Sequence, residues 1–264
     1  MLLLSSITIY PIKGFPGIQL EEAVLEPQGL QYDRRWMLVD EQGVFISQRT
    51  SAQLALFGLN QKEDGFEVIA PNKSASFFVP FATNGIQIPV KVWDDEVLAT
   101  HYSNDADAWF SKQLNLSCSL VFLPAQSTRL LESNYNPSGL ETVSFADGFP
   151  YLLIGHESLN DLNQRLAQPI LMDRFRPNFV ITGGIPFLED SFTEFSIGSN
   201  QFAALKPCAR CTVTTINQQS AIQEKEPLKT LSTYRQVDNK ILFGMNVVWR
   251  GGSGLVRIAE SVKA

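Results

Sequence analysis

Short β-prone runs, each ended by turn residues, fill the first hundred residues and constrain the fold more than any other feature. Asp40–Gly43 has the composition of a hairpin turn, so it predicts two antiparallel strands on either side of it. Strands at such short and regular spacing are typical of a β-barrel or a β-sandwich. The predicted strands of this region are Ile7–Tyr10, Ala23–Leu25, Trp36–Val39, Val44–Ile46, Phe66–Ile69, Ile86–Ile88 and Val90–Trp93.

Helical patterns are few. We expect Asn104 or Asp105 to cap a helix that runs to Leu114, and a second helix over Glu157–Ala167, where three leucines share one face. Later strands are predicted at Phe179–Ile181, Phe202–Leu205 and Thr212–Ile216. The predicted fold is therefore mainly β with a few helices, and we place a soft boundary near residue 120.

Length and composition exclude several classes of protein. The 264 residues can bury a large core, and 44% apolar with 18% charged residues is a globular balance. A net charge of -6 argues against a nucleic-acid binder, which usually carries a basic face. We see no apolar run of the roughly 18 residues that span a bilayer, and Met1–Tyr10 resembles a strand more than a signal peptide. We therefore expect a cytoplasmic protein without a membrane partner.

The most informative stretch is Lys206–Cys211, which contains a Cys-x-x-Cys pair. A structural zinc site needs about four ligands, and the chain offers few others, so zinc is disfavoured. A thioredoxin-like pair precedes a helix, whereas Thr212–Ile216 is β-prone. A reactive thiolate beside Arg210 suits a soft transition metal. Two buried cysteines acting as small hydrophobes remain the plain alternative.

Cations cluster at the ends of predicted strands elsewhere in the chain. Because guanidinium groups bind phosphate through two parallel hydrogen bonds, several such clusters in an acidic protein indicate a local anion pocket. The stretches concerned are Tyr10–Gly14 with Lys13, Asp33–Trp36 with Arg34, Ser47–Arg49, and Asp173–Asn178 with Arg174 and Arg176.

These stretches resemble the MOSC family, whose domain is found at the C-terminus of molybdenum cofactor sulfurases. The nearer resemblance is to the YcbX-like proteins and the mitochondrial amidoxime-reducing components. Residues 1–120, with Tyr10–Gly14 and Asp33–Trp36, resemble the N-terminal β-barrel region that accompanies MOSC. Residues 121–264 resemble the MOSC β-barrel domain proper, through Phe145–Pro150, Arg176–Asn178, Cys208–Thr212 and Leu228–Gln236.

The resemblance implies a molybdenum cofactor, a Mo-pyranopterin, with Cys211 as ligand to the metal and as a catalytic residue together with Asp147. By the same resemblance, the pyranopterin and its phosphate are bound by Lys13, Arg34, Gly148, Arg176, Asn178 and Arg210. The implied activity is the reduction of small N-hydroxylated compounds. The alternative is a cofactor carrier or a sulfur relay that turns over no substrate.

Some positions depart from the family pattern. Ala209 and Gly14 stand where relatives often have Ser, and Ala259-Glu260 replaces a Gly-Asp pair. With three cysteines the chain cannot hold a four-cysteine iron–sulfur cluster. Electrons are therefore expected from a separate donor protein of the ferredoxin or flavoprotein type.

Overall fold

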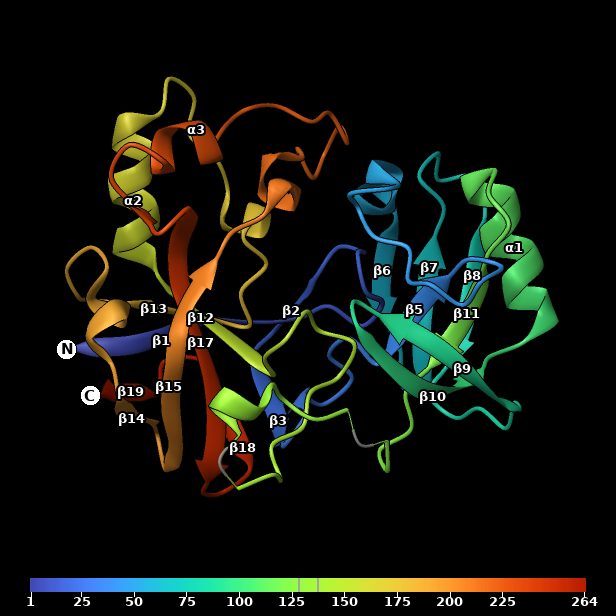
Figure 1. The fold of residues 1–264 in the computed structure, drawn as a ribbon, viewed down its shortest axis with the longest axis horizontal. Helices are drawn as coiled ribbons and strands as arrows, with labels where there is room; N and C mark the ends of the chain where they lie inside the picture. The colour runs from blue at the N-terminus through green and yellow to red at the C-terminus, as the bar shows by residue number, and fades with distance from the viewer. Residues whose placement is uncertain (128, 137) are drawn as a thin grey trace.

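The computed structural model describes residues 1–127, 129–136 and 138–264, and their strands gather in two lobes that lie side by side (Figure 1). We call the part built by residues 36–122 the N-terminal lobe. The part built by residues 1–30 and 151–264 is the barrel lobe. Strands outnumber helices in the described residues, so the prediction of a mainly β chain with a few helices is confirmed.

The barrel lobe contains a closed ring of seven strands. The order is β12-β13-β1-β19-β14-β15-β17, and a second pairing of β12 with β17 closes the ring. The pair β12 and β13 is parallel, while the other neighbours are antiparallel. The ring strands are β1 (Leu2–Ile9), β12 (Tyr151–Gly155), β13 (Phe179–Thr182), β14 (Glu194–Ile197), β15 (Asn200–Ala209), β17 (Lys240–Gly251) and β19 (Ser261–Lys263).

Five further strands belong to the barrel lobe. One pairs with β1, one pairs with β17, and three form a small separate sheet. They are β2 (Ile18–Leu20), β16 (Gln236–Val237), β3 (Glu22–Glu26), β4 (Gly29–Leu30) and β18 (Leu255–Arg257). Strands within residues 2–30 thus pair with strands from the far end of the chain. The boundary that we placed near residue 120 is a division of the sequence into two domains, and it stays a prediction.

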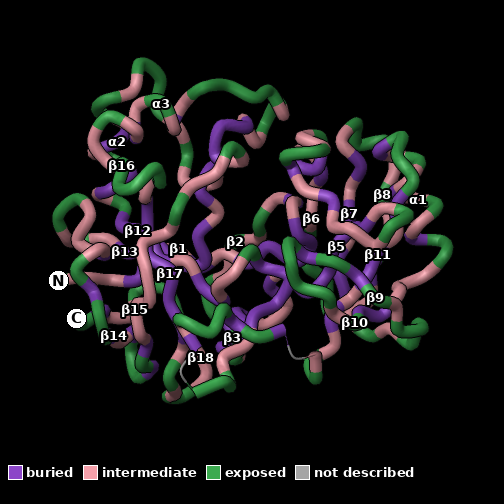
Figure 2. Tube along the Cα trace, viewed as in Figure 1, coloured by how far each residue is buried: buried purple, intermediate pink, exposed green. Residues whose placement is uncertain are grey.

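Aromatic side chains fill the barrel. The ring of Tyr151 stacks on Phe179 at 5.5 Å, and Phe202 meets both rings edge-on. All three side chains are almost completely buried, and such rings contribute much of the apolar area that stabilises a core. Figure 2 shows buried residues along the inner strands and exposed ones on the peripheral loops.

The N-terminal lobe consists of a four-stranded and a three-stranded antiparallel sheet covered by one helix. The predicted strands Ile86–Ile88 and Val90–Trp93 are one strand, because Pro89 lies at the edge of its sheet, where no N–H is needed. The strands are β5 (Trp36–Val39), β9 (Gln87–Val92), β10 (Asp95–His101) and β11 (Ser119–Phe122), and then β6 (Gly58–Gln61), β7 (Gly65–Ile69) and β8 (Ser76–Pro80).

The first predicted helix is present as α1 (Asn104–Leu114), but the residue predicted to cap its N-terminus is wrong. Ser103, not Asn104 or Asp105, is the N-cap, and its Oγ accepts a hydrogen bond from Ala106 N at 3.1 Å. The second predicted helix is α2 (His156–Arg165), which buries Leu159 and Leu162. A short helix, α3 (Leu228–Leu231), follows.

The remaining helical pieces are short 3₁₀ turns. The predicted strand Val44–Ile46 is only a pair of isolated bridges, from Phe45 to Val39 and from Val44 to Lys91. No helix of the described residues is long and apolar enough to cross a membrane. The 3₁₀ turns are η1 (Ala52–Leu56), η2 (Ser133–Tyr135), η3 (Met172–Arg174), η4 (Leu188–Ser191) and η5 (Thr212–Thr215).

Candidate functional site

A cleft between the two lobes gathers the site residues that the family resemblance implies. The space inside it that water-sized molecules can occupy is about 140 Å³. Both lobes contribute to its walls, since segments before residue 50 and after residue 146 meet there. The eight predicted site residues that line it are Lys13, Arg34, Asp147, Gly148, Arg176, Asn178, Arg210 and Cys211.

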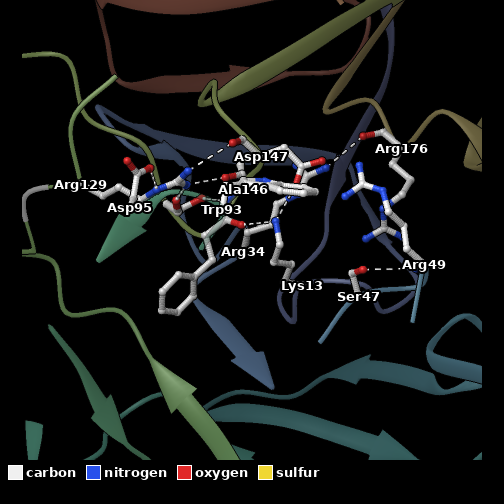
Figure 3. A network of polar contacts seen from close by, with 12 residues as sticks. Lys13, Arg34, Ser47, Arg49, Trp93, Asp95, Arg129, Ala146, Asp147 and Arg176 are labelled. Carbon is white, nitrogen blue, oxygen red and sulfur yellow. Dashed lines mark hydrogen bonds and ion pairs between the residues drawn. The ribbon is translucent and has the colours of Figure 1, made fainter. Parts of the chain in front are cut away.

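A buried lysine and a carboxylate from opposite ends of the sequence meet at the centre of the cleft. Lys13 Nζ donates to Asp147 Oδ1 at 2.6 Å and to the Phe145 carbonyl at 2.7 Å (Figure 3). Burial lowers the pKa of Lys13, and Asp147 opposes that shift. Desolvation inside the cleft would raise the pKa of Asp147, but the Lys13 ammonium, together with Arg49 and Arg34, outweighs it and holds that pKa well below its usual value. Asp147 is therefore a carboxylate at neutral pH. Its side chain is 65% exposed.

Two arginines form a cationic pair on the inner wall. Arg34 and Arg176 place their guanidinium carbons 4.3 and 4.2 Å from the ring centre of Tyr10. Arg34 is paired with Asp33 at 2.6 Å, but within the described residues no carboxylate pairs with Arg176. Desolvation lowers the pKa of Arg176 to about 10, and the positive charge of Arg34 adds to that shift.

Both arginines also have strained backbones. Arg34 has φ +50° and Arg176 has φ +57°, values in the left-handed region that non-glycine residues seldom adopt. Arg34 is held there by hydrogen bonds to Asn178 Oδ1 and to the Arg176 carbonyl, each at 3.1 Å. Strain of this kind tends to be retained where function requires a particular side-chain direction.

Asn178 is buried, and its amide is already engaged within the protein. Besides Arg34, it accepts a hydrogen bond from Leu152 N at 3.2 Å and donates to the Thr8 carbonyl at 3.1 Å. It thus ties β1, β12 and Arg34 together. Gly148, in contrast, has open space in front of its Cα, since a Cβ there would meet nothing within 4 Å.

The Cys-x-x-Cys segment leaves the barrel where β15 loses its regular pairing with β17. Register shifts occur between Ala204 and Lys206 and again between Pro207 and Ala209. Such bulges bend a strand and redirect its side chains, and they recur beside functional sites. Cys208 and Cys211 both line the cleft as a result, and both are half-buried free thiols.

One expectation about this segment was wrong. Thr212–Ile216 is not a strand, because Thr212–Thr215 forms the turn η5, in which the carbonyls of Cys211, Thr212 and Val213 accept hydrogen bonds from residues three positions later. Arg210 lies beside Cys208: its Nη1 is 3.0 Å from Cys208 Sγ, and Nη2 donates to the Phe175 carbonyl at 2.6 Å. Across the described residues, no cluster of three or more His, Cys, Asp or Glu side chains is placed to hold a metal ion.

Sequence reasoning missed a second layer of residues around Asp147. Arg129 is buried and donates from Nη1 to the Ser144 carbonyl at 2.8 Å and from Nη2 to the Asp147 carbonyl at 3.2 Å, while Nε pairs with Asp95 at 2.8 Å. Trp93 Nε1 donates to Asp147 Oδ1 at 3.3 Å. Figure 3 shows this network around the Asp147 loop. Nothing in the sequence near Arg129 marks it, whereas a tryptophan in a two-residue turn is unusual enough to have been noticed.

A wider groove continues the cleft toward solvent, and we call it the outer groove. It shares with the cleft the walls formed by Asp147, Phe149 and the two cysteines. Its further walls come from the turn between β9 and β10 and from the segment that precedes Asp147. They include Trp93, Val97, Leu130, Leu131 and Val143.

Comparison with known proteins gives two domain matches and a set of relatives. The MOSC N-terminal beta barrel domain matches residues 1–117, and the MOSC domain matches residues 141–263. The chain is 33% identical to mitochondrial amidoxime-reducing component 1 of Mus musculus, over 87% of this chain and 70% of that protein. It is 28% identical to mitochondrial amidoxime reducing component 2 of Bos taurus, over 89% of this chain and 72% of that protein.

A second group of relatives is longer. The chain is 30% identical to the molybdenum cofactor sulfurase of Solanum lycopersicum over 92% of its own length, but it spans only 32% of that protein. The two domain matches follow each other along the chain in the order that the sequence predicts. The relatives also align with most of the chain. The chain belongs to the MOSC domain family and is similar to the mitochondrial amidoxime-reducing components.

Proposed function

We propose that this protein binds a molybdenum cofactor and works as an oxidoreductase that reduces N-hydroxylated compounds. The observation that carries the proposal is the cleft itself, where the Cys211 thiol shares one space with the cations Lys13, Arg34 and Arg176. A soft sulfur ligand suits molybdenum, and the cations suit the phosphate of a pyranopterin.

The residues of the cleft fit such a group. Arg176 is a desolvated guanidinium without a carboxylate partner in the described chain, and it lies close to the charge of Arg34. A bound anion would relieve that repulsion. Arg210 Nε is buried without a hydrogen-bond partner, and Gly148 leaves backbone facing open space. Each feature is an incomplete interaction that a phosphate-bearing ligand would complete.

The cofactor, when bound, supplies two-electron chemistry at its metal. The protein's own residues supply orientation and protons. Replacing an N–OH bond by N–H consumes two electrons and two protons and releases water. Lys13 Nζ carries a proton at the centre of the cleft, and burial lowers its pKa, which favours release of that proton. Asp147 stays ionised and holds the ammonium in place through Oδ1.

Electrons in this proposal come from a separate protein of the ferredoxin or flavoprotein type. The three cysteines of the chain cannot bind a four-cysteine iron–sulfur cluster. The outer groove provides a solvent-facing route to the cleft through which a small N-hydroxylated substrate can enter.

A cofactor carrier or sulfur relay is the second candidate. It is favoured by Cys208, a second thiol in the same cleft that is contacted by Arg210, because a pair of thiols can pass a sulfur atom between them. Relatives named molybdenum cofactor sulfurase keep this candidate open.

One experiment separates the two candidates. The protein is purified from a host that makes the cofactor, its molybdenum and pterin are quantified, and turnover of N-phenylhydroxylamine is followed with reduced viologen as donor. We expect stoichiometric metal and turnover, both lost in Cys211→Ala and both kept in Cys118→Ala, whose cysteine is buried in the N-terminal lobe. Metal without turnover, or a persulfide on Cys211, would favour the carrier. Metal and activity retained by Cys211→Ala would refute both.

A further inference from the structure

The tight turn that joins β9 and β10 contains an unexpected residue. Val92 and Asp95 pair across the hairpin, so Trp93 and Asp94 are its two turn residues. Trp93 has φ +57°, where hairpin turns prefer Gly or Asn and where a bulky side chain is a clear outlier. The turn alone would fold more easily with glycine, so the reason for a tryptophan must lie in its side chain.

The indole is fixed by three contacts at the edge of the cleft. Its Nε1 donates to Asp147 Oδ1 at 3.3 Å. The guanidinium of Arg49 lies 4.3 Å from the ring centre, and the ring of Phe45 meets it edge-on at 4.7 Å. The turn itself is anchored, because Asp95 pairs with the buried Arg129. Figure 3 shows Trp93 between Arg129 and Lys13, beside Asp147.

Despite these contacts, 39% of Trp93 stays exposed, and that part lies on the wall of the outer groove. The neighbouring walls mix apolar side chains, including Val97, Leu130 and Phe149, with charged ones such as Glu96 and Lys206. A rigid, partly exposed aromatic ring binds a flat group well, because two rings can stack at little cost in side-chain entropy.

We infer that Trp93 is a specificity-determining residue, which stacks on the planar part of an aromatic substrate while its Nε1–H keeps the Asp147 carboxylate in position. The inference rests on the proposed function and adds a substrate class to it: N-hydroxylated compounds whose N–OH is attached to a flat aromatic group. Strain in the turn is retained because it aims the ring into the groove.

The test compares two substrates of equal size, planar N-phenylhydroxylamine and non-planar N-cyclohexylhydroxylamine, on cofactor-loaded enzyme. In Trp93→Gly we expect the ratio of their kcat/KM values to fall about tenfold toward no preference, mainly through KM, while molybdenum content is kept. Trp93→Phe should keep most of the preference. Lys73→Gly is the matched control, since Lys73 has the same φ of +57° in an exposed turn outside the cleft. An unchanged ratio in Trp93→Gly overturns the inference.

Two further readouts keep the inference independent of turnover. Trp93→Gly relieves the strained φ but also loses the contacts of the indole, so it should unfold at a lower temperature than Lys73→Gly, which only relieves the strain. Titration with N-phenylhydroxylamine should quench the tryptophan fluorescence of the wild type and of Trp109→Phe but not that of Trp93→Gly. Equal quenching in all three rules out stacking on Trp93. A wild type that binds but reduces neither compound refutes the proposed function and leaves the binding test intact.

Discussion

The two walls of the cleft are built in different ways. The barrel lobe presents its residues from or beside long paired strands, with Cys208 in β15 and Asn178 next to β13. The cationic wall presents Lys13, Arg34 and Arg176 from turns and loops, and the two arginines have positive φ. The thiols are therefore positioned through paired strands, whereas the cationic wall depends on strained turns and loops held by a few hydrogen bonds. Loss of a single bond should harm the second wall more than the first.

The largest effect is expected from Arg129→Ala, which breaks the connection between the walls. Removing this buried side chain leaves the carbonyls of Ser144 and Asp147 without a donor and frees Asp95. Unfolding should lose about 3 kcal/mol in urea titrations. Arg257→Ala removes an exposed pair with Glu22 and should cost no more than about 1 kcal/mol. Equal losses in the two variants would show that Arg129 does not couple the walls.

Arg34→Gln and Arg176→Gln compare the two cationic residues directly. Each should weaken cofactor retention by about 1.5–3 kcal/mol, measured as molybdenum lost during dialysis, because each removes a charged donor. Their effects on stability should differ in sign. Arg34 makes three bonds that its loss would break, whereas Arg176 is a desolvated charge, so Arg176→Gln should stabilise the cofactor-free protein. Destabilisation by Arg176→Gln would contradict an unfilled anion site.

Ser103→Ala tests the N-terminal lobe without touching the cleft. Loss of the hydrogen bond to Ala106 N should lower the free energy of unfolding by about 1 kcal/mol and leave molybdenum content unchanged. Asn104→Ala, one residue later, should have a smaller effect. A reversed order, measured by denaturant titration, would restore Asn104 as the cap.

The smallest effect is expected from pH. The pKa of Asp147 is lowered in the folded protein by Lys13, so the carboxylate adds stability above its ordinary pKa of 3.8, and this stability is lost as pH falls below that value. Because the side chain is largely exposed, the loss between pH 5 and pH 2 should be only about 0.5 kcal/mol larger in the wild type than in Asp147→Asn. Identical acid titrations would show that the pair contributes no stability.

The sequence predicted the parts of this molecule that local patterns control. Short apolar, β-prone runs identify β1, β5 and β7, and a leucine stripe identifies α2. The convergence of Lys13, Arg34, Arg176 and Cys211 followed from the family resemblance, because residues separated by up to 198 positions share no local pattern. Their roles, like the cytoplasmic location, stay predictions.

The failures have physical reasons. Thr212–Ile216 has high β propensity, but two register shifts in β15 turn the chain out of the sheet before it reaches Thr212. Ser103 was overlooked as a cap because Asn104 and Asp105 are equally good capping residues. Trp93 and Arg129 act through contacts with Asp147, which lies 54 and 18 positions away from them, and no propensity reports such contacts.

The pairing of β1 with β13 and β19 has a consequence for synthesis of the chain. Leu3 pairs with Thr182 and with Ser261, so β1 cannot complete its pairing until residues far along the chain have been synthesised. Residues 36–122 can pair among themselves much earlier, since their sheets use partners from the same segment. During that interval the part of β1 that does not pair with β2, residues 2–6, has unpaired edges, the kind of segment that chaperones protect from aggregation.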